Sequence, residues 1–365
     1  MQPSYSFLQE IWKRFKKNKG GLFGLIVIII TVLVSIFGYL IAPDGSPDAD
    51  LQTVEIQAKK PGYEQLFLRI PNKEIISISW LHYLLYGKQD QYKYVPIVNY
   101  KIQGDILTVN KYIDTDTSVA QSFSINKLTG NEWDKISDYL VTKKYWLGTD
   151  TFGRDILSRL IIGTRISLAV GLIAVIISLL LGIILGALAG YYRRWIDEVI
   201  VWLINVTWSI PTLLLVFALT LALGKGFWQI FIAVGLTMWV SVARLVRGQV
   251  IAIKEQEFIQ AARALGLGDM RIIARHILPN ILGPVMVIAA GNFASAIIIE
   301  AGLSFLGIGV QPPEPSWGLM IKENYNFIIT HNPMLALIPG LAIMLLVLAF
   351  NLLGNGLRDA LDVKN

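Results

Sequence analysis

The segment QAARALGLGDMRIIARHILP, residues 260–279, is basic, punctuated by glycine and flanked by two apolar stretches of membrane-spanning length. About 20 apolar residues are enough to cross a bilayer as a helix. A short polar segment between two such helices lies at a membrane surface, and its arginines favour the cytoplasmic side. We therefore interpret the chain as a polytopic membrane protein and this segment as a cytoplasmic loop that another protein binds.

The composition supports a membrane protein and excludes several other classes. Of the 365 residues, 54% are hydrophobic and 16% are charged, and the mean hydropathy is +0.55. The net charge of +6 does not indicate a nucleic-acid partner, because the basic residues gather at the ends of apolar runs as topology signals. There is no cysteine for a disulfide or a thiolate site, and no metal is expected at His82, His276 or His331, which lack ligand spacing.

Uncharged runs long enough to span a bilayer predict six transmembrane helices. They occupy residues 20–43, 166–192, 199–224, 226–243, 276–299 and 324–357. The first run is too long for the apolar core of a signal peptide, and no small-residue cleavage site follows it, so it is predicted to be a retained helix.

The distribution of basic residues predicts that both termini are cytoplasmic. Inner segments then carry most of the lysine and arginine, from the cluster at Lys13 to Lys19 to the arginines of 244–275. Three arginines on the predicted outer side are an exception: Arg154, Arg159 and Arg165. Asp150 and Asp155 partly offset their charge, and the inner excess is larger.

Residues 44–145, between the first and second spans, carry 12 basic and 13 acidic residues and are predicted to lie outside the membrane. Apolar and polar residues alternate along Val98 to Tyr112 on both sides of Gln103-Gly104-Asp105, which predicts a hairpin. The stretch from Ser122 to Asn126 alternates similarly. We therefore expect a small β-containing extracytoplasmic insert.

Two features of the predicted helices bear on their packing. The second span has a small residue at every fourth position: Ala174, Ser178, Gly182, Gly186 and Gly190. Such a ladder allows close helix approach, either within the bundle or against a partner membrane subunit. Pro211 is expected to kink the third span.

The loop after the fourth span is predicted to contain a short amphipathic helix over 254–265, with Phe258, Ala262 and Leu265 along one apolar stripe. Gly266 ends this helix because glycine tolerates left-handed backbone geometry. The solvent-facing side carries a small residue beside two polar ones: Ala261, Gln260 and Glu257.

A second short helix is predicted at 270–278, capped by Asp269, with Pro279 in the first turn of the next span. The result is a helix that lies across the cytoplasmic end of the bundle. Its exposed side, with Ala261 beside Gln260 and Glu257, has a shape suited to insertion into a groove on another protein.

Motifs for chemistry are absent. The sequence has no G-x-x-x-x-G-K-[ST] loop to bind ATP phosphates, and neither G-x-S-x-G nor H-E-x-x-H occurs. The chain is therefore not expected to be an enzyme, and any ATP that it uses is expected on a separate subunit.

The pattern Gln260-Ala261-Ala262, Gly266 and Ile277-Leu278-Pro279 resembles the E-A-A, G, I-x-L-P signature of permease subunits of bacterial ABC importers. Several further stretches resemble the C-type permeases of dipeptide, oligopeptide and nickel importers: LGTDTFGRDILSRLIIGTRISL (147–168), VARLVRGQV (242–250), EAGLSFLGIGVQPPEPSWG (300–318) and AFNLLGNGLRDALD (349–362). Two features depart from the family: Gln260 replaces its usual glutamate, and the insert is longer than in most members. Glu257, one turn earlier, is a candidate to supply the missing charge.

The resemblance implies an all-α membrane protein with six transmembrane helices of the type I ABC importer permease kind, plus the β-containing insert. It divides the chain into a tail and first helix (1–43), the insert (44–145), a permease core (146–355) with a coupling loop (247–282), and a cytoplasmic tail (356–365). By the resemblance, a coupling helix seats in the ATPase through five residues: Glu257, Gln260, Ala261, Ala262 and Gly266.

The partners implied by the resemblance are a second permease in a heterodimer, ATP-binding subunits that hold ATP and magnesium, and an extracytoplasmic substrate-binding protein. The location implied is the bacterial inner membrane. The implied function is ATP-driven import of di- or oligopeptides, with nickel or another small solute as the alternative.

On the outer side, residues 147–160 are predicted to lie along the membrane surface, with breaks at Gly148 and Gly153 and then a helix around 156–161 that precedes the second span. This segment either braces the external gate or the docked binding protein, or it forms a membrane-entry collar. Glu300, near the outer end of the fifth span, is either a functional residue or one that reaches the interface. The candidates for the gate or docking site are Asp150, Arg154, Asp155 and Glu300. Residues 318–330 are expected to form a short external or re-entrant helix.

The sequence favours two other functions less strongly. An ion-driven secondary transporter would carry ionisable residues near the bilayer midplane, and the predicted spans are nearly free of them. An adhesion protein that uses the insert would not require six spans and a coupling loop. Both are therefore less favoured than an importer subunit.

Overall fold

The computed structural model describes residues 7–72, 78–126, 133–224, 226–329 and 332–361. It divides the chain into two compact units. We call residues 1–32, 167–311 and 341–365 the helical unit, and residues 33–166 and 312–340 the insert unit.

The helices follow the apolar pattern of the sequence. The long helices are α2 (Lys19–Ile41), α5 (Ile156–Tyr192), α8 (Phe227–Lys254), α11 (Leu278–Phe305) and α13 (Met334–Leu361). The shorter ones are α1 (Phe7–Phe15), α3 (Trp80–Tyr86), α6 (Arg194–Trp208), α7 (Thr212–Leu223), α9 (Glu257–Ala264), α10 (Asp269–Ile272) and α12 (Trp317–Asn324). A π-helical turn (Ile273–Ile277) joins α10 to α11, and four 3₁₀ turns cover Pro47–Ala49, Val54–Ile56, Trp133–Tyr139 and Tyr325–Ile328.

Five helices of the described chain are long and apolar enough to cross a membrane, and a sixth span results if α6 and α7 count as one. Those two helices are bent by 94° at their junction, where Pro211 is the residue before α7. The kink predicted at Pro211 is confirmed, and it is a sharp break because proline cannot donate a backbone hydrogen bond.

Several predicted boundaries were wrong. The second span does not begin at residue 166 after a separate surface helix, because α5 is one helix of 37 residues from Ile156. No proline interrupts this helix. Pro315 and Trp317 pack against its first part, because a Cβ added at Gly163 would lie 3.3 Å from atoms of both residues. The fourth span runs on to Lys254, and the last span is α13 rather than 324–357. The predicted helix at 318–330 is found as α12, and Thr330 lies outside the described residues.

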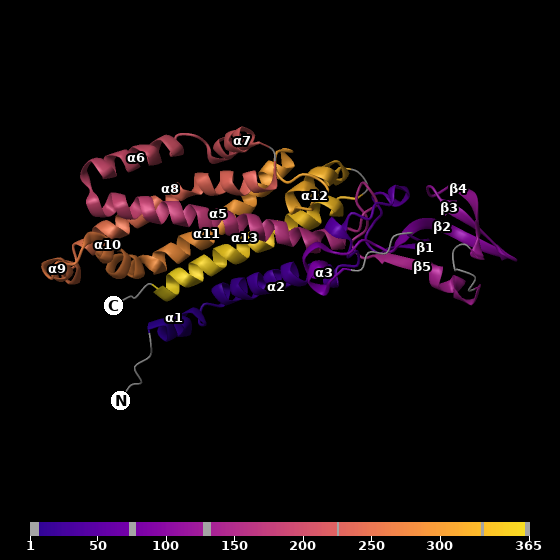
Figure 1. The fold of residues 1–365 in the computed structure, drawn as a ribbon, viewed down its shortest axis with the longest axis horizontal. Coiled ribbons are helices and arrows are strands. Elements are labelled where there is room, and N and C mark those ends of the chain that lie inside the picture. Colours follow the sequence, from indigo (N-terminus) through magenta and orange to yellow (C-terminus); the bar gives the residue numbers. More distant parts are fainter. Residues whose placement is uncertain (1–6, 73–77, 127–132, 225, 330–331, 362–365) are drawn as a thin grey trace, which may run out of the picture. The chain divides into compact units, whose positions relative to one another are not determined.

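The small-residue ladder of α5 packs within the bundle. A Cβ added at Gly186 would lie 2.5 Å from the carbonyl oxygen of Ala243 in α8, and one at Gly182 would lie 2.5 Å from Val242 Cβ. Ser178 accepts a hydrogen bond from Asn292 of α11 at 3.2 Å. Of the two alternatives left open by the sequence, close packing within the bundle is therefore confirmed for these residues (Figure 1).

Replacing Gly186 with alanine should destabilise the bundle by about 2 kcal/mol, because the new methyl group overlaps α8 backbone and the two helices must separate. The matched change Gly248→Ala should be neutral or stabilising by up to ~1 kcal/mol, since no described heavy atom lies within 4 Å of a Cβ there and alanine favours helix. Thermal unfolding of the purified protein measures both changes. Equal shifts of the unfolding temperature in the two variants would contradict close packing of Gly186 against α8.

The described part of the insert unit contains one antiparallel sheet in the order β4-β3-β2-β1-β5 (Figure 1). Its strands are β1 (Tyr63–Pro71), β2 (Tyr92–Gln103), β3 (Ile106–Tyr112), β4 (Ser118–Ser124) and β5 (Leu140–Tyr145). The predicted hairpin is confirmed as β2 and β3, with Gly104 at φ 60° in the turn, and the alternation near Ser122 belongs to β4. One buried cluster, centred on Leu68 and Leu107, stabilises one side of the sheet.

Candidate functional site

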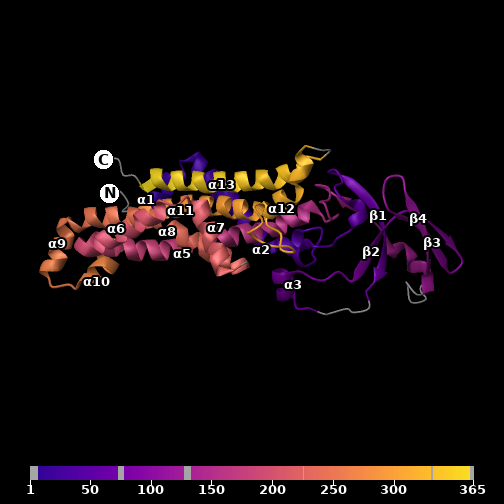
Figure 2. The ribbon, with the colours of Figure 1, turned by 90° about the horizontal axis from the view of Figure 1, so that it is seen from above.

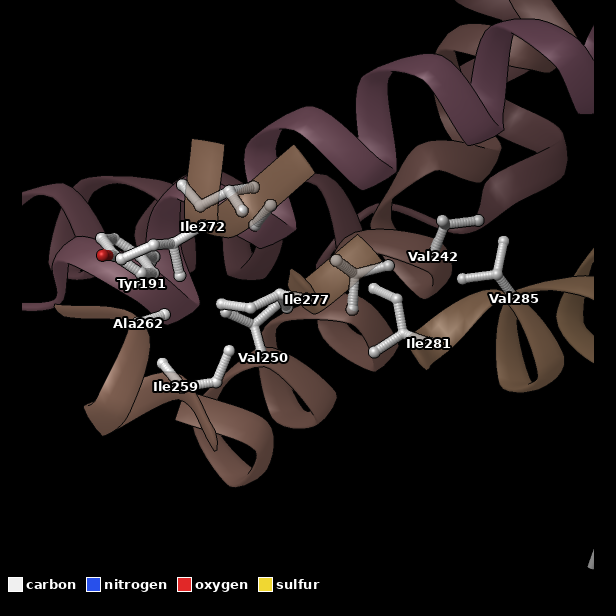
Figure 3. Close-up of a cluster of buried hydrophobic side chains, with 12 residues drawn as sticks. Tyr191, Val242, Val250, Ile259, Ala262, Ile272, Ile277, Ile281 and Val285 are labelled. Carbon is white, nitrogen blue, oxygen red and sulfur yellow. The ribbon is translucent and has the colours of Figure 1, made fainter. Parts of the chain in front are cut away.

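The helix α9 is held against the end of the helical unit by its buried side chains. Ile259 is fully buried and Ala262 is 5% exposed, and both belong to one apolar cluster (Figure 3). The other buried members come from α5, α8, α10, the π-helical turn and α11: Ala187, Tyr191, Val242, Val246, Val250, Ile272, Ile273, Ile277, Ile281 and Val285. Displacement of α9 would therefore disturb the ends of several long helices.

The opposite side of α9 is exposed, as the sequence predicts. Glu257, Gln260 and Ala261 face solvent, and Ala262 faces the cluster. The Gln260 side chain donates a hydrogen bond to the Glu255 carbonyl at 3.2 Å. Glu257 is in the first turn, where the helix dipole favours a negative charge. The exposed side thus offers one carboxylate, one amide and one small residue.

The predicted apolar stripe was wrong at two of its three positions. Phe258 is 46% exposed and Leu265 is 81% exposed, whereas Ile259 is the residue that packs inward with Ala262. Helix α9 ends at Ala264, so Leu265 lies beyond it. The sequence contained two adjacent apolar residues, and only the tertiary packing shows which of them is buried. The exposed Phe258 and Leu265 add an apolar component to the surface offered to a partner.

The turn after α9 depends on Gly266 and on residues that the sequence analysis missed. Gly266 has a φ of 75°, and its N–H donates to Arg263 O at 2.8 Å, so the expected helix end is confirmed. Asp269 does not cap a helix with its side chain; Gly268 is the capping residue, and Asp269 accepts a hydrogen bond from Tyr191 Oη at 2.6 Å. No separate helix covers 270–278, because α10 continues through the π-helical turn into α11.

Tyr191, at the end of α5, organises this region. Its carbonyl accepts a hydrogen bond from Lys254 Nζ at 2.7 Å, and Lys254 and Arg263 lie over its ring at 5.2 and 5.1 Å.

The sequence analysis also missed a contact between α8 and α6. Arg247 of α8 donates two hydrogen bonds to the carboxylate of Asp197 of α6, at 2.5 and 2.8 Å. The sequence around Asp197 gave no signal of this pair, because its partner lies 50 residues away.

In the part of the chain that is predicted to lie on the outer side, Asp150 and Arg154 belong to a group of five charged residues in the insert unit, of which Asp50 is 28% and Glu323 11% exposed and the other three are buried. We call this group, formed by Asp50, Asp150, Arg154, Arg159 and Glu323, the outer ion cluster. Arg154 lies 2.6 Å from Asp150, 2.6 Å from Glu323 and 3.2 Å from Asp50, and Arg159 lies 3.3 Å from Glu323. The cluster joins the start of the insert, the turn before α5, and α12.

Electrostatic interactions in the cluster favour the charged form of Arg154. Burial opposes the charge of Arg154, but the carboxylates of Asp150 and Glu323 outweigh that effect, and its pKa is raised above the ordinary value. Two arginines face three carboxylates, so the buried charges are nearly balanced. This pairing would allow the two arginines to lie on the predicted outer side despite the positive-inside trend.

The other two predicted outer residues lie elsewhere. Asp155 does not pair with the arginines; its carboxylate accepts hydrogen bonds from the N–H and hydroxyl of Ser158 in the first turn of α5, and burial raises its pKa. Glu300, in α11 of the helical unit, accepts a hydrogen bond from Ser304 at 2.7 Å. Asp150, Arg154, Asp155 and Glu300 are each at most 6% exposed, which speaks against direct contact with a docked protein.

Arg165 is also used structurally. Its guanidinium donates hydrogen bonds to the carbonyl oxygens of Ser35 and Ile36 in α2, and of Leu84 and Leu85 in α3. Within the part of the chain that the structure describes, no group of three or more His, Asp or Glu side chains is placed to hold a metal. His331 lies outside that part.

Apolar helices of spanning length, with the short helix α9 packed at their ends, define a multi-pass membrane protein. The family described as "Binding-protein-dependent transport system inner membrane component" matches residues 182–364, half of the chain, and the chain belongs to this family. A second description, "N-terminal TM domain of oligopeptide transport permease C", matches residues 6–58. The chain is thus a non-catalytic inner membrane subunit of an ABC importer, a system that includes ATP-binding subunits.

Named relatives are similar over most of their length. The dipeptide transport system permease protein DppC of Alkalihalophilus pseudofirmus is 43% identical over 68% of this chain and 79% of its own. The glutathione transport system permease protein GsiD of Pectobacterium atrosepticum is 44% identical over 60% of this chain and 73% of its own. A solved structure of the MetNI methionine ABC transporter is 19% identical, covers 57% of this chain and 98% of that one, and gives a TM-score of 0.47.

Proposed function

We propose that the chain is the permease subunit of an importer for di- or oligopeptides, and that it forms half of the translocation path. The relatives named for dipeptide and glutathione transport support a peptide-like substrate. The observation that carries the coupling role is the position of α9, which is exposed on one side and packed on the other against the ends of α5, α8 and α11.

We propose that α9 seats in a groove of the ATP-binding subunit, through Glu257, Gln260, Ala261, Ala262 and Gly266. A rigid helix with short connections to α8 and α10 transmits motion of the ATPase to the spans. ATP and magnesium bind on that partner. Gln260 retains hydrogen bonding at the position of the family glutamate, and Glu257 supplies the negative charge.

The proposed orientation places both termini and α9 in the cytoplasm and the insert outside. Within the helical unit, α1, α9, α10 and the end of α13 lie at the same end (Figures 1 and 2). This end carries the basic residues of α1, Arg263, Arg271 and Arg275, as the positive-inside rule requires of a cytoplasmic side. A second permease and an extracytoplasmic binding protein complete the proposed complex.

The substrate is tested with the complete complex in liposomes, by comparing ATP-dependent uptake of a dipeptide, an oligopeptide and nickel. We expect the peptides to be taken up at least tenfold faster than nickel, since the named relatives carry peptide-like solutes. Faster nickel uptake would favour the metal alternative. Uptake that follows a proton gradient and ignores ATP would contradict the importer and indicate a secondary transporter.

A further inference from the structure

The helix α1 lies directly before the first membrane-spanning helix. It ends at Phe15, and α2 begins at Lys19. Three intervening residues extend at most about 3.5 Å each, so α1 cannot leave the neighbourhood of the membrane surface where α2 enters. It is therefore placed at the level of the lipid headgroups.

Packing within the helical unit fixes α1 in that place. Phe15 is 2% exposed, and Cβ atoms added at Gly21 of α2 and Gly356 of α13 would lie 3.0 and 2.9 Å from its ring. Asn18 donates a hydrogen bond to Asp359 of α13 at 2.7 Å and accepts one from the Gly21 N–H at 2.8 Å. The helix is thus held by both neighbouring spans rather than by its connection alone.

The surface that remains exposed combines an aromatic ring with basic residues. Trp12 is 47% exposed, and Lys16 Nζ lies 5.2 Å from the centroid of its ring. Lys13 and Lys17 are also exposed. Tryptophan concentrates at membrane interfaces, and lysine beside it is typical of helices that lie in the interface plane.

The charge of this segment has one sign. Five basic residues lie between positions 7 and 19: Lys13, Arg14, Lys16, Lys17 and Lys19. Glu10 is the single acidic residue in that range, and it forms an ion pair with Arg14 at 2.6 Å. A polybasic cluster adjoining a membrane span attracts anionic lipid.

We propose that α1 and residues 16–19 form a binding site for the headgroups of anionic phospholipids. The lysines contact the lipid phosphates, and Trp12 lies at the boundary between headgroups and acyl chains. A bound lipid would brace the junction of α1, α2 and α13. This proposal does not depend on which substrate the importer carries.

The test uses the full chain in nanodiscs that contain phosphatidylcholine and phosphatidylglycerol, with bound lipids counted by native mass spectrometry. The wild type should be enriched in phosphatidylglycerol, and the triple variant Lys13→Gln, Lys16→Gln, Lys17→Gln should lose that enrichment by about tenfold, since each basic residue contributes to binding at an anionic surface. Arg14 and Lys19 remain in this variant to set its topology. Substituting arginine at the same three positions should preserve the enrichment.

The matched control replaces three exposed lysines of the insert unit with glutamine: Lys60, Lys93 and Lys101. It removes the same charge and should leave lipid enrichment unchanged. Raising the salt concentration should lower the enrichment of the wild type, because ions screen surface charges. The proposal is overturned if the α1 variant retains its enrichment, if the insert variant loses as much, or if salt has no effect on the wild type.

Discussion

Replacing Ala261 with arginine should leave the permease inserted in the membrane and reduce ATP-driven uptake by about fivefold or more. Ala261 is exposed on α9 and contributes a single methyl group to the side that faces solvent. Arginine is a good helix former, so the fold should tolerate it. In the complex, the long charged side chain would enter a fitted groove, and overpacking of 1–3 kcal/mol lowers the population of the seated state roughly 5- to 150-fold.

Uptake and ATP hydrolysis should be measured on the same proteoliposomes. If the proposed coupling through α9 is right, uptake should fall much further than hydrolysis, because ATP binds on a separate subunit and the substitution leaves that subunit unchanged. The matched control is Ala252→Arg, which places the same side chain on an exposed position of α8, outside α9. Unchanged uptake in the Ala261 variant, or an equal loss in the Ala252 variant, would refute the coupling role.

The spans and the existence of α9 could be predicted because their signals are local. Uncharged runs of sufficient length reveal the long helices, and Pro211 reveals the break between α6 and α7. The orientation of α9 could not be predicted, because Phe258 and Ile259 are adjacent and an eight-residue helix contains too few turns to define one apolar face. Burial of Ile259 is decided by side chains of five other elements.

The insert shows a similar limit. Its central hairpin was predicted because β2 and β3 are joined by a two-residue turn that contains glycine. The strands β1 and β5 were not, since Tyr63 pairs with Tyr145 across more than 80 residues of chain. The outer ion cluster was missed for the same reason: Arg154 meets Asp50 and Glu323, which lie 104 and 169 residues away. Sequence spacing shows the Asp150 to Arg154 pair alone.

The outer ion cluster leads to the second large effect, expected for Arg154→Met. The arginine side chain is 2% exposed and lies within 3.2 Å of three carboxylates. Removing it leaves the buried Asp150 and the partly exposed Asp50 and Glu323 without their nearest countercharge. Breaking a buried pair from one side costs about 3–5 kcal/mol, whereas methionine recovers only part of the apolar contact. Amide protection against hydrogen exchange should therefore fall by a corresponding amount, both in α12 and in the turn that precedes α5.

A matched control separates this burial effect from the loss of any ion pair in the insert unit. Lys144→Met breaks the pair with Glu64 at 2.9 Å, whose side chains are 43% and 54% exposed, and it should change stability by less than about 0.5 kcal/mol. Adding Glu323→Gln to the Arg154 variant should recover part of the lost protection, because one unpaired carboxylate is removed. If Arg154→Met lowers amide protection as little as Lys144→Met does, the cluster does not hold the start of the insert to α12. A large loss with partial recovery would show that charge balance at this site stabilises the outer part of the permease.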